Sequence, residues 1–395
     1  MSVDATTTPR WVDTDTALAE VVDQLADAPA FALDTEFHRE RTYFPKLALV
    51  QLSYEPDQLV LIDPLAVDLA PMAEVLESDT TVVIHAASQD LEVLRLATGT
   101  VPRNLFDTQI AAGFVGYSNP SLAVLHTGLL DIALNKSDRL TDWLVRPLPE
   151  QVLAYAADDV RYLLQIHERL VAELTADERL EWALSECDLE RARGAETKDP
   201  DEAWRRVKGA GRLRGRPAAV ARSVAAWRER RAAELDIPVR HVLGDLALVS
   251  IAQRPPRDAA ALAKVRGVDS RALKGDSATG LLEAVAAGQQ AEPPARESKG
   301  PRRTDANLGP AVALLSSWLT QYAHELRIDT QLLATRKDIE HFVEHTGRGR
   351  LADGWRRDLV GRPMQDLLDG SAALAFDAER GIVLEPRRDR AANLR

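Results

Sequence analysis

The first third of the chain is patterned as short strands. Residues 31–37, 46–54 and 58–62 are apolar runs of the length and composition that favour strands. The breaks between them contain Pro45 and the sequence Glu-Pro-Asp at 55–57, which favour turns. Because no helix fits into connections this short, we expect the three strands to be antiparallel neighbours in one sheet.

Helical periodicity begins after a fourth apolar run. Residues 81–86 predict a buried strand, and Ser88 is the expected N-cap of the helix that follows. A longer helix is expected over residues 150–174, with Pro149 near its first turn, a position that favours proline. We therefore predict that residues 1–195 form an α/β domain, with helices packed on a mixed sheet.

Two polar connections divide the remaining, mostly helical part of the chain. Residues 196–217 are basic and contain several glycines, and residues 291–306 combine proline, glycine and basic residues in a composition typical of linkers. They separate a helical segment at 218–290 from a second one at 307–395. We predict that these segments form two small all-α domains.

The two helical segments share a weak internal repeat. At identical spacings, each segment has a tryptophan, a glutamate–leucine pair and an isoleucine: Trp227, Glu234, Leu235 and Ile237 in the first, and Trp318, Glu325, Leu326 and Ile328 in the second. The repeat favours duplication of a small helical module. Two amphipathic helices that happen to share a tryptophan are the alternative interpretation.

Charge is distributed unevenly along the chain. The formal net charge is −12, and an acidic protein is not expected to coat nucleic acid by itself. Residues 1–200, however, hold 15 basic and 35 acidic side chains, residues 201–300 hold 19 and 12, and residues 301–395 hold 15 and 14. The balances are −20, +7 and +1, and this asymmetry indicates a charged partner.

Other features of the composition predict a cytoplasmic protein. The single cysteine, Cys187, cannot form an intramolecular disulfide, which fits a reducing compartment. No basic and apolar signal segment is visible at the N-terminus. The uncharged stretches 108–130 and 306–324 contain too many polar residues or glycines to be membrane spans. We expect a monomer that makes no membrane contact.

Carboxylates occur at three places where an α/β domain could bring them together. Asp34 and Glu36 are two residues apart at the end of an apolar strand, so both side chains point to one face. Asp90 lies in the first turn of a helix that follows a strand, a place where ligand sites are common. Asp159 lies four residues after Tyr155, on a helix face that is otherwise apolar.

Each of these positions, taken alone, also has an ordinary explanation. Asp34 and Glu36 could be solvated acids at a strand edge, Asp90 could complement a helix dipole, and Asp159 could form a buried salt bridge or hydrogen bond. Together, the four carboxylates could hold two divalent ions about 3.5–4 Å apart, as in many nucleases and phosphatases. A cation between the acids would offset their repulsion, and Tyr155 could hold the attacking water.

Three segments resemble, in order, the exonuclease motifs of the DEDD superfamily. They are FALDTEF at 31–37, HAASQDLEV at 85–93 and YAADDVRYLL at 155–164. The third is of the tyrosine subtype, because the histidine subtype would need histidine where Ala154 stands. Two further segments, at 106–109 and 136–144, resemble the ribonuclease D family in particular. The basic middle region resembles the helicase-and-RNase-D C-terminal (HRDC) module, and the end region, including residues 354–359, resembles a second, divergent one.

The resemblance implies a ribonuclease-H-like fold and a metal-dependent 3′→5′ exoribonuclease. Asp34, Glu36, Asp90 and Asp159 map to the family's ligands for two ions, Mg²⁺ or Mn²⁺, and Tyr155 maps to its water-positioning tyrosine. Expected substrates are RNA 3′ ends, including tRNA precursors, and the products are nucleoside 5′-monophosphates. The alternatives are a 3′→5′ DNA exonuclease with the same metal chemistry, and a nucleic-acid-binding protein that keeps the fold without catalysis.

Several residues outside the carboxylate positions are candidates for contacts with RNA. Residues 201–231 hold 10 basic and 3 acidic side chains, a density that suits phosphate contacts, and we expect this segment to bring RNA to an acidic catalytic domain. The individual candidates are His85, Lys136, Arg139, Arg212 and Arg214. A solvated helix face for the basic run and a hydrogen-bonded core position for the histidine are the alternatives.

Overall fold

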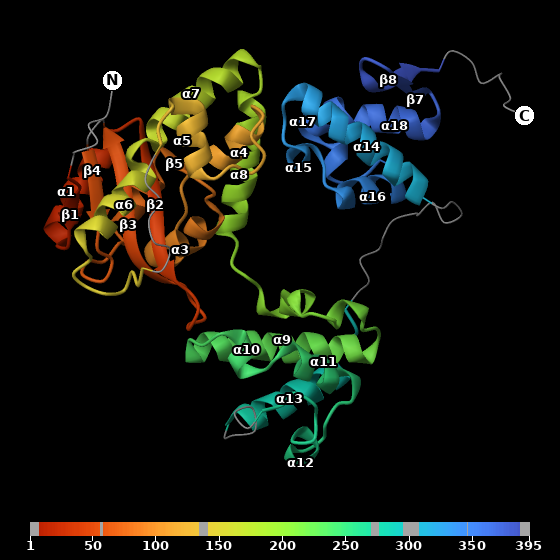
Figure 1. The fold of residues 1–395 in the computed structure, drawn as a ribbon. Coiled ribbons are helices and arrows are strands. Elements are labelled where there is room, and N and C mark those ends of the chain that lie inside the picture. Colours follow the sequence, from red (N-terminus) through yellow and green to blue (C-terminus); the bar gives the residue numbers. More distant parts are fainter. Residues whose placement is uncertain are drawn as a thin grey trace, which may run out of the picture.

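The computed structural model describes residues 8–55, 58–133, 141–269, 276–294, 308–345 and 347–387. Figure 1 shows three parts: an N-terminal α/β unit, a middle helical unit and a C-terminal unit. A sheet of six strands, in the order β1-β4-β3-β2-β5-β6, forms the centre of the α/β unit. Its strands are β1 (Arg10–Val12), β2 (Ala30–His38), β3 (Lys46–Glu55), β4 (Gln58–Ile62), β5 (Thr81–Ile84) and β6 (Asn104–Asp107).

The pairing of the central strands confirms the predicted arrangement. β2 pairs with β3, and β3 with β4, in antiparallel fashion, whereas β2 pairs in parallel with β5. The sequence pattern does not predict the edge strands β1 and β6, because their three and four residues are too few to show alternation. The result is the mixed sheet that the sequence indicates, with the strand carrying Asp34 and Glu36 near its centre.

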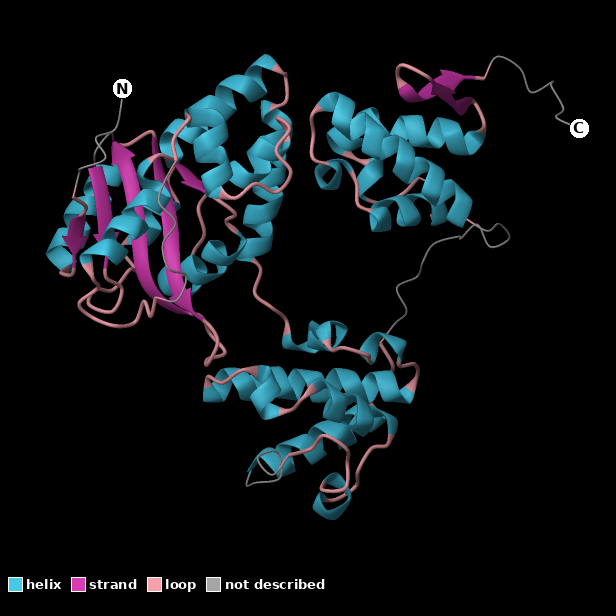
Figure 2. Cartoon of the chain, in the orientation of Figure 1, coloured by secondary structure: helices cyan, strands magenta, loops and turns pink. Residues whose placement is uncertain are grey.

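Helices cover both faces of the sheet, as Figure 2 shows. On one face lie α1 (Asp15–Ala26), α2 (Met72–Leu76) and α3 (Ser88–Thr98), and on the other lie α4 (Thr108–Gly113), α5 (Leu122–Leu130), α6 (Glu150–Arg161), α7 (Leu163–Ala176) and α8 (Leu180–Ala195). Leu33 of β2 belongs to the core with α1–α3, and Ala32 belongs to the core with α4–α8. Alternation therefore places Asp34 and Glu36 under the second layer of helices.

The helix expected over residues 150–174 is two helices in the structure. α6 and α7 are separated at Tyr162, whose φ of −111° and ψ of 4° are not helical. Tyr162 is buried and packs edge-on against His126. The sequence pattern does not show this break, because neither proline nor glycine marks it and the burial of Tyr162 depends on a helix elsewhere in the chain.

The middle unit is helical throughout its described residues and has its own core. Its helices are the 3₁₀ helices η1 (Pro200–Arg206) and η2 (Ala210–Arg212), followed by α9 (Arg216–Leu235), α10 (Val239–Val242), α11 (Asp245–Gln253), α12 (Ala259–Leu262) and α13 (Asp276–Gln290). Ala203, Val207 and Ala210 are buried in this core. Much of the basic segment expected to be an exposed connection is therefore packed against α9. The expected linker at 291–306 lies mostly outside the described residues.

The C-terminal unit repeats the first helices of the middle unit and then departs from them. It contains α14 (Gly309–Leu326), α15 (Thr330–Leu333), α16 (Arg336–Glu344), η3 (Arg350–Ala352), α17 (Gly354–Arg356), the π-helical turn η4 (Arg357–Gly361), α18 (Arg362–Asp369), β7 (Ala372–Asp377) and β8 (Gly381–Pro386). α15 and α16 begin 91 residues after α10 and α11, at 330 and 336 against 239 and 245, which supports the predicted duplication. The antiparallel hairpin β7–β8 is a departure from the all-α expectation, and positive φ at Gly381 permits its turn.

The C-terminal unit shares a continuous apolar core with the α/β unit. Trp182 of α8 stacks on Trp355 of α17 with ring centroids 5.1 Å apart, and Phe114 meets the same indole edge-on at 5.4 Å. Trp318 and Leu125 belong to the same buried cluster although they come from different units. Among the described helices, none is both long and apolar enough to cross a membrane.

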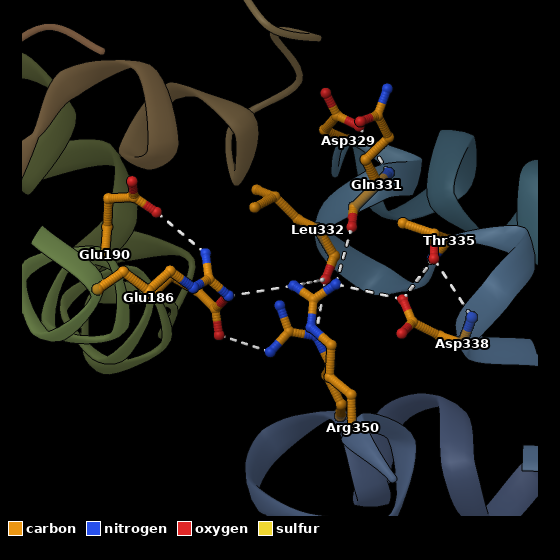
Figure 3. Close-up of polar contacts among 10 residues, drawn as sticks. Glu186, Glu190, Asp329, Gln331, Leu332, Thr335, Asp338 and Arg350 are labelled. Atoms are coloured by element: carbon orange, nitrogen blue, oxygen red, sulfur yellow. Dashed lines mark hydrogen bonds and ion pairs between the residues drawn. The ribbon is translucent and has the colours of Figure 1, made fainter. Parts of the chain in front are cut away.

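A buried ion-pair cluster lies at the same interface. Glu186 of α8 accepts a hydrogen bond from Arg356 at 2.5 Å. It accepts a second one from Arg350 at 3.2 Å (Figure 3). Glu186 and Arg356 are 7% and 4% exposed. Burial opposes ionisation of Glu186, but its contacts with Arg356, and then with Arg350, hold its pKa below the usual value. The C-terminal unit is thus joined to α8 by ionised side chains as well as by aromatic ones.

Candidate active site

Three of the predicted carboxylates converge beside the central strand. β2 pairs with β5 only as far as Ala32, so Asp34 and Glu36 lie beyond the paired end of β5. Both lie on the sheet face covered by α6, and α6 contributes Asp159. One carboxylate oxygen from each of these three residues lies within 4.8 Å of the other two. The tertiary structure therefore brings together acids that are far apart in the sequence.

Asp90 borders the same pocket from the α3 side. It is 6% exposed and lies in the first turn of α3, where its Oδ1 accepts a hydrogen bond of 2.5 Å from the hydroxyl of Thr35. Asp90 is not part of the group within 4.8 Å, although it lines the pocket with Asp34 and Glu36. Sequence reasoning does not single out Thr35, because strand alternation directs it away from its two acidic neighbours.

Asp107, at the end of β6, holds the turn that leads into α3. Its carboxylate accepts hydrogen bonds from the backbone N–H groups of Ala86 at 3.1 Å and Ala87 at 2.8 Å. Ala86 has a φ of 61°, a conformation that non-glycine residues rarely adopt. The prediction that Ser88 caps α3 is therefore wrong: Ala87 occupies the N-cap position, and a carboxylate from a neighbouring strand satisfies its N–H group.

Tyr155 lies one helical turn before Asp159 and borders the same pocket, whose volume is about 280 Å³. The ring of Trp143 lies 6.5 Å from that of Tyr155. Trp143 is partly buried and also packs against an apolar cluster that includes Leu49 and Leu61. The tyrosine and the carboxylate of α6 thus form one wall of the pocket.

Burial is the largest cause of a raised pKa at each of the four carboxylates. It raises the pKa of Asp34 well above the usual value, and repulsion from Asp90, Asp159 and Glu36 adds to it. Burial, with repulsion from Asp159 and Asp90, raises the pKa of Glu36 to about 8. Burial and repulsion from Asp158 raise the pKa of Asp159 to about 7. Burial also raises the pKa of Asp90 to about 6, although the hydrogen bond from Thr35 lowers it in part. Without a counter-charge, the pocket therefore retains protons at neutral pH.

This donor set fits a hard divalent cation. All the candidate ligands are carboxylate oxygens, which Mg²⁺ and Mn²⁺ prefer. A cation would favour the ionised form of each acid and so remove the repulsion that raises their pKa values. Asp34 is the central member, because each of the other three carboxylates contributes to its raised pKa. The pocket is therefore suited to bind divalent metal.

Gln51 is a further polar residue beside the site that sequence reasoning does not single out. It is the direct partner of Asp34 in the β2–β3 ladder, so the two side chains lie on the same face. It is 0% exposed, and neither Oε1 nor Nε2 has a hydrogen-bond partner within the described part of the chain. An unpaired buried amide costs about 1–3 kcal/mol, so its place next to the carboxylates also fits a pocket completed by a polar ligand.

The structure places the residues predicted to contact RNA in different environments. His85 borders the pocket, with Nδ1 2.9 Å from the hydroxyl of Thr108, and burial lowers its pKa to about 4. It is therefore an uncharged, hydrogen-bonded histidine at neutral pH. Lys136 and Arg139 lie outside the described residues. Arg212 and Arg214 are exposed in the middle unit and do not line the pocket.

Half of the ten basic residues at 201–231 form ion pairs within the protein. The pairs are Arg205 with Glu202, Arg206 with Glu229, Arg228 with Asp245, Arg230 with Asp201, and Arg231 with Glu234. For these five arginines, the alternative interpretation holds: they lie on a protein surface where neighbouring carboxylates neutralise their charge. The basic excess available for RNA is therefore smaller than the sequence count implies.

Comparison with known proteins agrees with this geometry. A family model described as 3′-5′ exonuclease matches residues 9–175, and the HRDC domain model matches residues 218–285. The fold and the acidic pocket thus define a 3′→5′ exonuclease followed by an HRDC domain. The ribonuclease D of Acidiphilium cryptum is 36% identical over 387 residues, which cover 95% of this chain and 97% of that protein. The chain belongs to the ribonuclease D family, and it is a 3′→5′ exoribonuclease.

Solved structures support the same assignment. The crystal structure of Escherichia coli RNase D, described as an exoribonuclease involved in structured RNA processing, matches with a TM-score of 0.80 and 34% identity. The match covers 92% of this chain and 99% of that one. The catalytic core of RRP6 from Trypanosoma brucei matches with a TM-score of 0.54 and 28% identity, over 73% of this chain and 83% of that one.

The raised pKa values predict how the stability of the metal-free protein depends on pH. An acid whose pKa is higher in the folded than in the unfolded state contributes stability at low pH that is lost as pH rises through the folded-state pKa. As pH rises from about 6.5 to 8, Asp159 (pKa about 7) and Glu36 (about 8) lose their protons in the folded protein, whereas both are already ionised in the unfolded chain. We expect the Tm of chelator-treated protein to fall across this window in a thermal scan.

Added Mn²⁺ should restore the Tm most strongly at the upper end of the window, because the ion binds the ionised carboxylates. A Tm that stays constant from pH 6.5 to 8 without metal would contradict the assigned pKa shifts.

Proposed function

We propose that the chain removes nucleotides from RNA 3′ ends by a two-metal mechanism centred on Asp34. The main support is the convergence of Asp34, Glu36 and Asp159 within 4.8 Å, with Asp90 on the wall of the same pocket. These four residues would hold two divalent ions, Mg²⁺ or Mn²⁺. The bound ions would activate water and neutralise charge that develops on the phosphoryl oxygens.

The surrounding residues would orient the acids and the nucleophile. The hydroxyl of Thr35 donates to Oδ1 of Asp90 and orients this carboxylate at the edge of the pocket. Tyr155 is proposed to hold the attacking water through its hydroxyl, because it shares a helix face and a pocket wall with Asp159. Hydrolysis of the terminal phosphodiester would release nucleoside 5′-monophosphates. tRNA and other small-RNA precursors are the proposed substrates.

We propose that the middle unit, which comprises the basic connection and the HRDC domain and is called the HRDC unit below, contributes the phosphate contacts that the acidic α/β unit (the exonuclease unit) lacks. Arg212 and Arg214 are the best candidates, since both are exposed in a segment where other arginines are paired. Replacing both by serine should lower the slope of log affinity against log salt by about 0.7 for each RNA phosphate that is no longer neutralised. An unchanged slope for a single-stranded RNA would show that other residues bind these phosphates.

We also propose the following domain organisation. The exonuclease domain spans residues 1–195, the basic connection 196–217, the HRDC domain 218–290, the linker 291–306 and a second HRDC-like domain 307–395. The constant 91-residue offset of α15 and α16 from α10 and α11 supports the last of these. We further propose that the protein acts as a cytoplasmic monomer, since its single cysteine is buried and unpaired.

Labelled RNA and DNA strands of one sequence, digested with Mg²⁺, with Mn²⁺ and with chelator, provide the direct test. We expect stepwise shortening of the RNA from its 3′ end in either metal and no reaction in chelator. Faster digestion of the DNA strand would favour a DNA exonuclease, because the metal site does not distinguish the two polymers. Tight binding without hydrolysis would favour a non-catalytic binder.

A further inference from the structure

The loop that follows β2, the strand that carries Asp34 and Glu36 and is called the catalytic strand below, is attached directly to the HRDC unit. This β2–β3 loop, residues 39–45, extends from the sheet to the end of α9 (Figure 1). Asp236 Oδ1 accepts hydrogen bonds from the backbone N–H groups of Tyr43 at 3.0 Å and Phe44 at 3.1 Å. The Tyr43 hydroxyl donates to Glu229 Oε2 at 2.9 Å. We refer to Tyr43, Phe44, Glu229 and Asp236 as the loop clamp.

Both acceptors of the loop clamp are fixed by α9. Glu229 is 7% exposed and also pairs with Arg206 of η1 at 3.1 Å. Asp236 ends α9 in the left-handed conformation, with φ of 48°, and its carboxylate is free to face the loop. Burial, with the nearby charge of Glu229, raises the pKa of Tyr43 to about 12, so its hydroxyl remains a donor at neutral pH.

The other end of the loop is bound by hydrogen bonds to α3, the helix that carries Asp90. Arg39 donates to Gln89 Oε1 and to Glu92 Oε2 on α3, each at 3.0 Å. Glu92 also accepts a 2.5 Å hydrogen bond from Lys198, in the segment that leads to the HRDC unit. Gln89 and Glu92 flank Asp90, and the loop itself continues the strand that carries Asp34 and Glu36. The loop thus connects α9 with β2, which carries Asp34 and Glu36, and with the first turns of α3, which carry Asp90.

The HRDC unit and the C-terminal unit are attached to the exonuclease unit in different ways. The C-terminal unit shares an apolar core cluster with α4–α8. The described residues of the HRDC core cluster come entirely from the middle unit, between Ala203 and Val285. The orientation of the HRDC unit relative to the pocket therefore depends on polar contacts, of which the loop clamp lies nearest to the catalytic strand.

We propose that the loop clamp is a positioning device that sets the HRDC unit at a fixed distance from the catalytic carboxylates. This inference rests on the proposed function, because a fixed distance matters only if RNA contacts both units at once. An RNA long enough to contact both units binds more tightly when their separation is fixed, because its second contact then forms at high effective concentration. A dinucleotide reaches only the pocket and gains nothing. The loop clamp would therefore favour long RNA over short RNA.

A pair of substitutions at Asp236 separates the hydrogen bonds from the backbone conformation. Asp236→Gly removes the acceptor but tolerates positive φ, whereas Asp236→Asn keeps both an acceptor oxygen and that tolerance. Tyr43→Phe removes only the bond to Glu229. Glu234→Gln is the matched control, because Glu234 lies in the same end of α9 and forms its ion pair with Arg231 of the same helix.

Two measurements on the full-length protein test the proposal. Dyes on cysteines introduced as Asp23→Cys and Glu283→Cys, both at exposed positions, report the distance between the units. Native Cys187 is 0% exposed and should not be labelled. We expect Asp236→Gly and Tyr43→Phe to broaden the distance distribution, and Asp236→Asn and Glu234→Gln to leave it unchanged.

The kinetic readout is kcat/KM in Mg²⁺ on a long RNA and on a dinucleotide. Asp236→Gly should lower the value about tenfold on the long RNA and leave the dinucleotide unaffected. An unchanged distance distribution, or an equal loss on both substrates, would overturn the proposal. If the wild-type protein degrades neither RNA, the proposed function fails, while the distance measurement still decides whether the loop clamp fixes the HRDC unit.

Discussion

Replacing Asp34 by asparagine is expected to lower kcat on RNA on the order of 10³-fold or more. Asp34 is the carboxylate that interacts with all three others, so its loss should remove the proposed shared ligand of the divalent ions. The amide has nearly the same shape and should fit the same space. In metal-free protein we expect the Tm to rise, because one buried, mutually repelling acid has been replaced by a neutral group.

The decisive measurements are single-turnover hydrolysis and Mn²⁺ binding by calorimetry, with circular dichroism to verify folding. Asp159→Asn should give the same pattern, since the two acids belong to one oxygen cluster. Glu55→Gln serves as the control, because Glu55 is an exposed acid at the end of β3 and lies outside the pocket. Undiminished activity of a folded Asp34→Asn protein would refute the metal site.

Replacing Glu186 by alanine is expected to reduce the free energy of unfolding by about 3–5 kcal/mol, the cost typical of leaving one member of a buried ion pair without its partner. Arg356 is 4% exposed and would lose the carboxylate 2.5 Å away. Arg350 would lose its ion pair across the interface as well. Denaturant titration measures the loss, and tryptophan fluorescence should report separation of the Trp182–Trp355 stack.

Glu190→Ala is the matched control for this interface. Glu190 lies one turn further along α8 and pairs at 3.0 Å with Arg193, and the two side chains are 18% and 67% exposed. Because one partner is largely in solvent, we expect this pair to contribute only about 0–1 kcal/mol. If the two variants were equally stable, the buried cluster in Figure 3 would not be what joins the C-terminal unit to α8.

The predicted acids illustrate which parts of the site could be found without a structure. Asp34 and Glu36 were accessible because strand alternation has a period of two, and Tyr155 and Asp159 because helical neighbours are four apart. Thr35 and Asp107 were not accessible. Each acts on a residue that belongs to another element, Asp90 in one case and the turn at Ala86 in the other. Their roles depend on contacts across the fold rather than on local spacing.

The basic segment shows the opposite limit of sequence reasoning. A count of charges over residues 201–231 favours RNA binding, but ion pairs such as Arg230–Asp201 join residues that are distant in sequence. Charge density alone cannot tell a paired arginine from a free one. The structure thus narrows the candidates to a few exposed positions, of which Arg212 and Arg214 are two.

By itself, the sequence determined the family, through motifs that resemble known ones, and the antiparallel central strands, through short-range patterning. It also predicted the candidate metal ligands and the duplicated helices. Only the tertiary structure decided which residues support them. The Thr35–Asp90 bond, the cluster around Glu186 and the loop clamp each join residues more than fifty positions apart. Such contacts depend on how elements pack, and packing is set by the whole core rather than by any one segment.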